Sequence, residues 1–217
     1  MAPMTNLIRI LIALALTAFA TTAHAHPHVW VAFKSEVVYA PDGSVTGIRH
    51  AWSFDDMFST FATQGIEAKE KGKFTREELA PLAEVNVTSL KEFDFFTYVT
   101  ADGKKQELTD PAQGEYWLDF KDSVLTLNFT LPLKSPVKAR NLEVEVYDPT
   151  VFVDFALDKN EPVKLAGAPA ACKLVTELPR ELSFSESRRL SQIGPTEKNT
   201  SMAIGAQLAN KIKVTCP

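Results

Sequence analysis

The chain has little cysteine, little histidine and no excess of positive charge, and these shortages exclude several classes of function. Its 217 residues include two cysteines and four histidines, and 23 lysines and arginines stand against 27 aspartates and glutamates. The resulting net charge of −4 argues against nucleic acid and anionic membrane surfaces as partners. The acidic balance instead suits a protein that attracts cations.

The motifs of common enzymes are also absent. The sequence contains no Gly-x-Ser-x-Gly elbow, no His-Glu-x-x-His pair, no Cys-x-x-Cys pair and no phosphate-binding glycine loop. His50 lies close enough in sequence to Asp55 for acid–base chemistry, but no nucleophile accompanies them. We therefore expect a protein that is not an enzyme.

A long apolar run occurs at residues 10–20, preceded by Arg9 as the only charged side chain. About eleven residues match the apolar region of a secretory signal peptide and are too few to span a bilayer. Ala23 and Ala25 form the small-x-small pattern that a signal peptidase reads. Cleavage after Ala25 is the favoured prediction, and cleavage after Ala23 remains the alternative.

This prediction divides the chain into a signal peptide, residues 1–25, and a single periplasmic domain, residues 26–217. The mature chain would carry 22 basic and 27 acidic residues, a net charge of −5, because only Arg9 is lost among them. We expect it not to be embedded in the membrane after processing.

The mature amino terminus would carry His26 and His28, so that a free amine and two imidazoles lie within three residues. Neutral imidazoles suit Ni(II), Co(II), Zn(II) and Cu(II), and the amine has a pKa near 8. Pro27 has no backbone N–H to lose, so a chain starting at His26 cannot bind Cu(II) or Ni(II) through its backbone amides. A chain starting at His24 can bind these metals through its backbone amides. Either start predicts a transition-metal site of open identity, and two exposed histidines on a strand end are the alternative.

Two strands, residues 29–40 and 45–54, flank a Pro-Asp-Gly-Ser turn and predict an antiparallel hairpin. Paired residue numbers in this hairpin sum to about 85, which places Trp30 opposite Asp55 and brings Asp55 diagonal to His28. Asp55 is therefore a candidate metal ligand, or a partner that orients a ligand, and the N-cap of a following helix is its structural alternative. His50 points to the other face.

Asp148 is the second acidic candidate for the metal site. It precedes a proline and interrupts an apolar stretch that otherwise alternates as a strand. A ligand role, or contact with a ligand, is one interpretation, and a turn or bulge in the strand is the other.

The rest of the chain predicts an α+β fold built on a mainly antiparallel sheet. Helical spacing covers residues 55–71, and a capping box from Thr75 to Glu78 opens a second helix toward Leu90. Strand patterns follow over residues 95–157 and again at residues 172–178 and 211–216, with a short polar helix at residues 183–192 and a loop at residues 195–201 between them. Cys172 and Cys216 predict a disulfide that ties the C-terminal segment, worth about 4 kcal/mol for a loop of about 45 residues.

The sequence resembles a bacterial periplasmic family of unknown function. Its members are often labelled as substrate-binding proteins of ABC transporters and are found beside nickel/cobalt efflux-type permeases. The resemblance rests on the HPHVWV and HAWSFD motifs at residues 26–31 and 50–55, and on residues 93–103, 146–150 and 204–216. An acidic residue expected just after the first motif is missing, because Ala32, Phe33 and Lys34 follow it.

The resemblance implies a periplasmic accessory of divalent-metal transport, with His26 and His28 as ligands and an inner-membrane metal permease as partner. Two alternatives remain. One is an interaction module that docks a permease without metal, and the other is an enzyme with a copper centre at its amino terminus. The direction of transport and the oligomeric state are left open.

Overall fold

The computed structural model describes residues 29–70, 72–150, 152–181, 183, 185–186 and 206–217. The predicted signal peptide and its cleavage site, together with His24, His26 and His28, lie outside the described residues.

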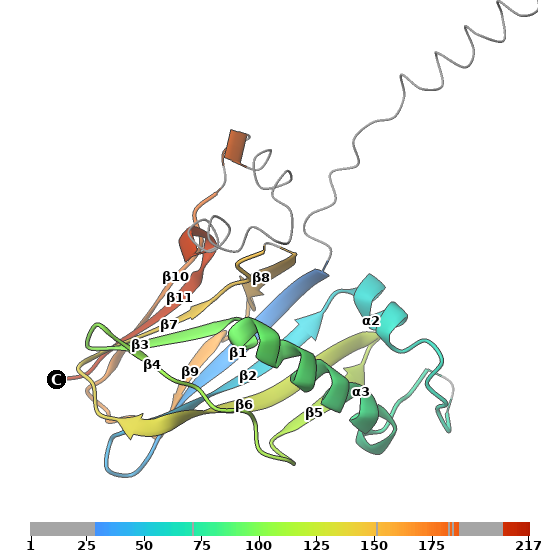
Figure 1. Cartoon of the computed structure of the whole chain (residues 1–217), viewed down its shortest axis with the longest axis horizontal. Coiled ribbons are helices and arrows are strands. Elements are labelled where there is room, and N and C mark those ends of the chain that lie inside the picture. Colours follow the sequence, from blue (N-terminus) through green and yellow to red (C-terminus); the bar gives the residue numbers. More distant parts are fainter. Residues whose placement is uncertain (1–28, 71, 151, 182, 184, 187–205) are drawn as a thin grey trace, which may run out of the picture.

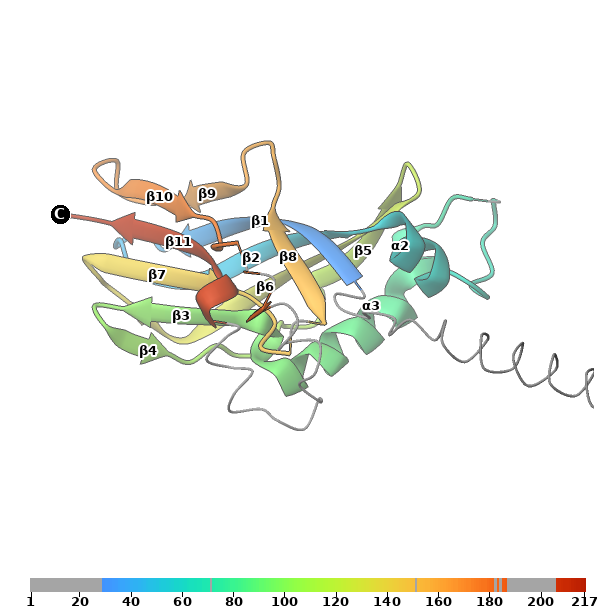
Figure 2. The ribbon, with the colours of Figure 1, turned by 90° about the horizontal axis from the view of Figure 1, so that it is seen from above.

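Within the described residues, the strands form two sheets that pack face to face with the apolar core between them (Figure 1, Figure 2). The first sheet has the order β5-β6-β2-β1-β8, with β9 also paired to β1. Its strands are β1 (Val29–Tyr39), β2 (Val45–Phe54), β5 (Tyr116–Lys121), β6 (Val124–Val137), β8 (Val153–Leu157) and β9 (Val163–Ala166).

The second sheet has the order β10-β11-β7-β3-β4. Its strands are β3 (Thr97–Ala101), β4 (Lys104–Gln106), β7 (Asn141–Val146), β10 (Lys173–Glu177) and β11 (Asn210–Thr215). Alternate residues point inward because strand side chains alternate between faces. On β6, Leu125, Leu127, Phe129 and Leu131 are fully buried, and Leu142, Val144 and Val146 of β7 face them from the other sheet.

The N-terminal hairpin has the predicted register. Val31 pairs with Phe54 and Ser35 with His50, so that paired numbers sum to 85 until a shift at Tyr39. The other edge of β1 pairs in parallel with β8 and then β9, which the sequence did not predict. The mainly antiparallel α+β fold with its N-terminal hairpin and two helices is confirmed.

The two helices lie toward the edge of the first sheet that β5 and β6 form (Figure 1). Helix α3 (Arg76–Leu90) begins with the predicted capping box, in which Thr75 and Glu78 bond each other's backbone N–H groups, and it packs against β5. A 3-10 segment, η1 (Lys91–Phe96), leads from α3 into β3.

Helix α2 (Asp56–Ala62) is shorter than the predicted helix over residues 55–71. The apolar spacing that suggested a longer buried face was misleading. Phe58 stacks against Phe54, and Ala62 and Ile66 also pack against the core, whereas Met57 and Phe61 remain exposed. The chain then turns at Gly65, whose φ of 81° is left-handed and ends any helical continuation.

The predicted disulfide joins Cys172 to Cys216. Both cysteines flank the antiparallel pair of β10 and β11, so the bridge holds the end of the chain to the strand before it. The described residues contain no free cysteine.

A buried histidine links the two sheets. His50 Nδ1 lies 2.9 Å from Ser35 Oγ, and its Nε2 lies 3.2 Å from Thr97 Oγ1 of the second sheet. The Thr97 hydroxyl donates its proton to the Phe95 carbonyl, so it accepts a hydrogen bond from His50 Nε2–H. Nδ1 then accepts from Ser35, and His50 is neutral. Complete burial lowers the pKa of His50 to about 3.

We expect His50 to make the fold sensitive to acid. The unfolded chain binds a proton at His50 below its ordinary pKa of 6.5, whereas the folded protein does so only near 3. The free energy of unfolding should therefore be highest above pH 6.5 and fall between these values by up to about 1.4 kcal/mol per pH unit. Urea unfolding from about pH 7.5 to about pH 4.5 measures this. In His50→Gln this contribution disappears, so a constant stability difference between the two proteins across pH would contradict the expectation.

Candidate metal site at the start of strand β1

The described chain begins at Val29, the residue directly after the predicted ligand His28. Hydrogen bonds hold this start of β1 from both sides. The Trp30 carbonyl accepts a hydrogen bond from the backbone N–H of Asp55 at 3.0 Å, and the Val29 N–H donates one to the Phe152 carbonyl at 3.4 Å. The position from which the predicted ligands extend is thus fixed between the end of β2 and the loop before β8.

Asp55 performs the structural role that the sequence offered as an alternative. Its Oδ1 accepts the Phe58 N–H at 2.8 Å as the N-cap of α2. Its Oδ2 accepts the Trp30 N–H at 3.0 Å. Asp55 therefore joins α2 to the start of β1, and its role as a metal ligand stays a prediction.

Asp148 is buried, and both of its carboxylate oxygens accept several hydrogen bonds. Oδ1 accepts from the backbone and hydroxyl of Thr150, and Oδ2 accepts from the N–H groups of Phe152 and Val153 at 3.0 and 2.9 Å. Because the carbonyl of Phe152 receives the Val29 N–H, Asp148 holds the loop that supports β1. The structure thus shows Asp148 stabilising a turn, as one of the two interpretations predicted. Its role as a metal ligand also stays a prediction.

Asp154 is the acidic residue that the sequence reasoning missed. In the parallel pairing of β1 with β8 it lies opposite Trp30, one strand away from the start of β1. Its carboxylate has no hydrogen bond or ion pair with any described residue. One side of the side chain reaches solvent, and packing on the other side raises the pKa of the carboxyl.

The sequence could have predicted only one aspect of the position of Asp154, namely that it faces outward. Its strand alternates between buried Phe155 and exposed Asp154, which predicts an outward position. Its neighbour on β1 depends on a parallel pairing between segments more than a hundred residues apart, which no local pattern shows.

Among the described residues, no three His, Cys, Asp or Glu side chains form a group that could hold a metal ion. A site built on His26 and His28 would draw its nitrogen donors from residues outside that range. The Asp154 carboxylate, which has no described partner, is an oxygen donor that fits such a site, because carboxylate oxygens complete imidazole sites for divalent transition metals.

Apolar side chains are exposed on the segments that adjoin this site. Trp30 of β1 is 45% exposed and Phe152 is 44% exposed, while Met57 and Phe61 of α2 are 67% and 70% exposed. Together they form what we call the apolar rim. Exposed apolar side chains are a common feature of docking surfaces.

No helix in the part of the chain that the structure describes has the length and apolar character needed to cross a membrane.

Comparison with known proteins assigns the chain to a family. A family model described as "Protein of unknown function (DUF1007)" matches residues 11–216, and the chain belongs to this family. A 95-residue stretch is 33% identical to an "Uncharacterized 15.5 kDa protein in trpE 3'region" from Spirochaeta aurantia. That match covers 43% of this chain and 66% of the relative, just under two thirds of its length.

Loss of charge at two aspartates near the site should change the stability of the protein by very different amounts. Asp148→Asn replaces an acceptor oxygen with an amide that faces N–H donors, so we expect the free energy of unfolding to fall by about 3 kcal/mol. Asp154→Asn should leave it unchanged or slightly raised, because its carboxylate has no described partner and packing disfavours its charge. Urea unfolding at neutral pH compares the two, and equal losses would contradict these assignments.

Proposed function

We propose that this member of the DUF1007 family is a periplasmic accessory protein that binds a transition metal for a divalent-metal transport system. Nickel and cobalt are the first candidate metals, and zinc or copper the alternatives. The proposal is supported by the pair His26 and His28, which directly precede β1 in the sequence, and by Asp154, which lies opposite Trp30 on the neighbouring strand and has no described partner.

The donors that support this proposal are the amino-terminal amine, the imidazoles of His26 and His28, and the Asp154 carboxylate. Nitrogen donors with one carboxylate suit divalent metals from cobalt to zinc. Each ligand must be deprotonated to bind, so affinity should rise from acidic to neutral pH. In this proposal Asp55 and Asp148 act as positioning residues, since their hydrogen bonds hold the two backbone segments beside the start of β1.

The protein in this proposal is a carrier and not an enzyme. A site at the amino terminus can exchange metal with a partner by direct contact, since its ligands lie at the end of a chain. The acidic balance of the chain favours cations over anions near its surface. The partner we propose is an inner-membrane metal permease.

The test is a competitive titration with Ni(II), Co(II), Zn(II) and Cu(II) of protein secreted and processed in its host. Intact mass on the same sample shows whether the chain begins at His26 or His24. We expect tight one-to-one binding that is lost in His28→Ala and when one extra residue precedes His26. Copper should bind most tightly in vitro whatever metal the cell supplies, so the order of affinities is poor evidence of the physiological metal. The metal that the protein carries when it is isolated from its host is the better indicator.

The carboxylate ligand has its own control. Asp154→Asn should weaken metal binding by about tenfold or more. Asp158→Asn removes a charge at the other end of β8, where Asp158 is paired with Lys34, and should leave binding unchanged. Equal affinities of the two variants would remove Asp154 from the site, and unchanged affinity in His28→Ala would contradict the metal proposal as a whole.

A second function, the docking of a permease without metal, is favoured by the apolar rim of Trp30, Met57, Phe61 and Phe152. Exposed aromatic and thioether side chains are typical anchors of protein interfaces. Association with inner-membrane vesicles from the host should then persist in the presence of a chelator. It should be lost in the double variant Met57→Ser and Phe61→Ser. Association that requires metal would favour the first function.

A further inference from the structure

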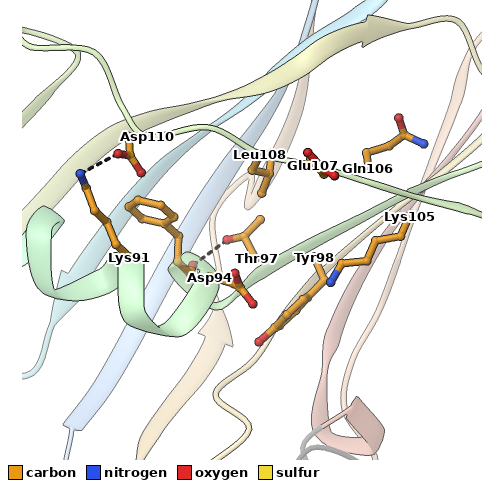
Figure 3. Close-up of a pocket in the computed structure, with 10 residues that line it drawn as sticks. Lys91, Asp94, Thr97, Tyr98, Lys105, Gln106, Glu107, Leu108 and Asp110 are labelled. Carbon is orange, nitrogen blue, oxygen red and sulfur yellow. Dashed lines mark hydrogen bonds and ion pairs between the residues drawn. The ribbon is translucent and has the colours of Figure 1, made fainter.

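A second candidate site lies away from the start of β1. A cleft of about 250 Å³ opens where η1 meets β3 and β4 (Figure 3). Four segments contribute to its walls, which makes it a product of the fold rather than of one loop. Its polar lining residues include Lys91, Asp94, Tyr98, Lys105, Gln106, Glu107 and Asp110.

Most of the charges in this cleft are already paired. Lys91 forms an ion pair with Asp110 at 2.6 Å, and Glu107 forms one with Lys134 at 2.6 Å. The side chains of Asp94 and Lys105 have no ion pair or hydrogen bond with any described residue. The cleft therefore presents one carboxylate and one ammonium group that are both available to a ligand.

Figure 3 shows the ring of Tyr98 between the side chains of Asp94 and Lys105. The Lys105 ammonium lies 5.8 Å from the centre of this ring, and the ring of Tyr147 also packs against it, with ring centres 4.7 Å apart. Burial and the surrounding negative charges, Asp94 among them, raise the pKa of Tyr98. Its hydroxyl thus stays protonated at neutral pH and can donate a hydrogen bond.

The position of Asp94 depends on an unusual backbone. Asp94, Phe95 and Phe96 have φ values of 51°, 51° and 49°, three consecutive non-glycine residues in the left-handed region. Side chains other than glycine rarely adopt this conformation because the β-carbon comes too close to the following carbonyl oxygen. Burial of the Phe95 and Phe96 rings in the core offsets the cost of this conformation and holds the turn. Asp94 is thereby carried to the edge of the cleft on a rigid turn.

We propose that this cleft binds a small zwitterion, a molecule of amino-acid size that carries one ammonium and one carboxylate group. The Asp94 carboxylate receives the ammonium group, the Lys105 ammonium receives the carboxylate, and the ring of Tyr98 contacts the apolar part between them. A volume of about 250 Å³ lies below the range of pockets for drug-sized ligands and suits a ligand of this size.

A second cleft provides a contrast that supports this choice. It has a volume of about 320 Å³ and lies on the outer face of the first sheet. Its cations Lys34, Arg49 and Lys164 are each paired with an acidic residue, respectively Asp158, Glu36 and Glu161. Although larger, that cleft neutralises its own charges.

The test is calorimetric titration of the mature protein with alanine, β-alanine and 4-aminobutanoate, and with methylamine and acetate as ligands of single charge. A chelator is present throughout, so that binding through a metal at the amino terminus does not contribute. We expect at least one zwitterion to bind. Methylamine and acetate should bind at least about tenfold more weakly, because each leaves one charged group of the cleft without a partner.

Variants of the two charged residues identify the site. Asp94→Asn and Lys105→Gln should each weaken binding of the zwitterion at least about tenfold. Asparagine tolerates left-handed backbone as aspartate does, so Asp94→Asn should fold, and a thermal unfolding scan checks this. Glu92→Gln and Lys104→Gln remove neighbouring exposed charges that do not line the cleft and serve as matched controls.

Three results would overturn the proposal. The first is no binding of any zwitterion up to about 10 mM. The second is equal affinity in the wild type, Asp94→Asn and Lys105→Gln. The third is binding that occurs only in a parallel titration without the chelator, which would assign the ligand to a bound metal.

Discussion

Hydrogen bonding along both edges of β1 is the constraint on which the rest of the structure depends. β2 pairs with one edge in antiparallel orientation, and β8 followed by β9 pairs with the other in parallel orientation. A strand held on both sides cannot shift its register without breaking two ladders at once. Its inward residues therefore form one wall of the core, and its first residues are fixed between α2 and the loop before β8.

The exposure of each acidic side chain to solvent decides whether its carboxylate must be hydrogen-bonded within the protein. A buried carboxylate must be hydrogen-bonded, and Asp148 meets this requirement with backbone N–H groups and the Thr150 hydroxyl. Asp55 likewise caps α2. Asp154 and Asp94 reach solvent and have no described side-chain partner. The first pair thus supports the backbone, whereas the second pair provides charges to which a ligand can bind.

Much of the local structure could be predicted from the sequence. The register of the N-terminal hairpin follows from its turn and its alternation, and the Thr75–Glu78 capping box marks the start of α3. The extended first helix was predicted wrongly, since its spacing was helical but Met57 and Phe61 stay exposed and the chain turns at Gly65. A periodic pattern shows which residues could share a face, and only the neighbouring elements decide whether that face is covered.

The candidate sites also combine features that local sequence predicts with features that only tertiary packing decides. The sequence by itself determined the histidine pair, the two cysteines and the outward position of alternate strand residues, because all three depend on residue type and short-range periodicity. The tertiary structure alone decided that Asp154 lies opposite Trp30. It also brought Asp94 and Lys105 to opposite sides of the Tyr98 ring (Figure 3). Both placements depend on strand pairing and on a left-handed turn held by core packing, and such long-range contacts leave no signal in the residues that they bring together.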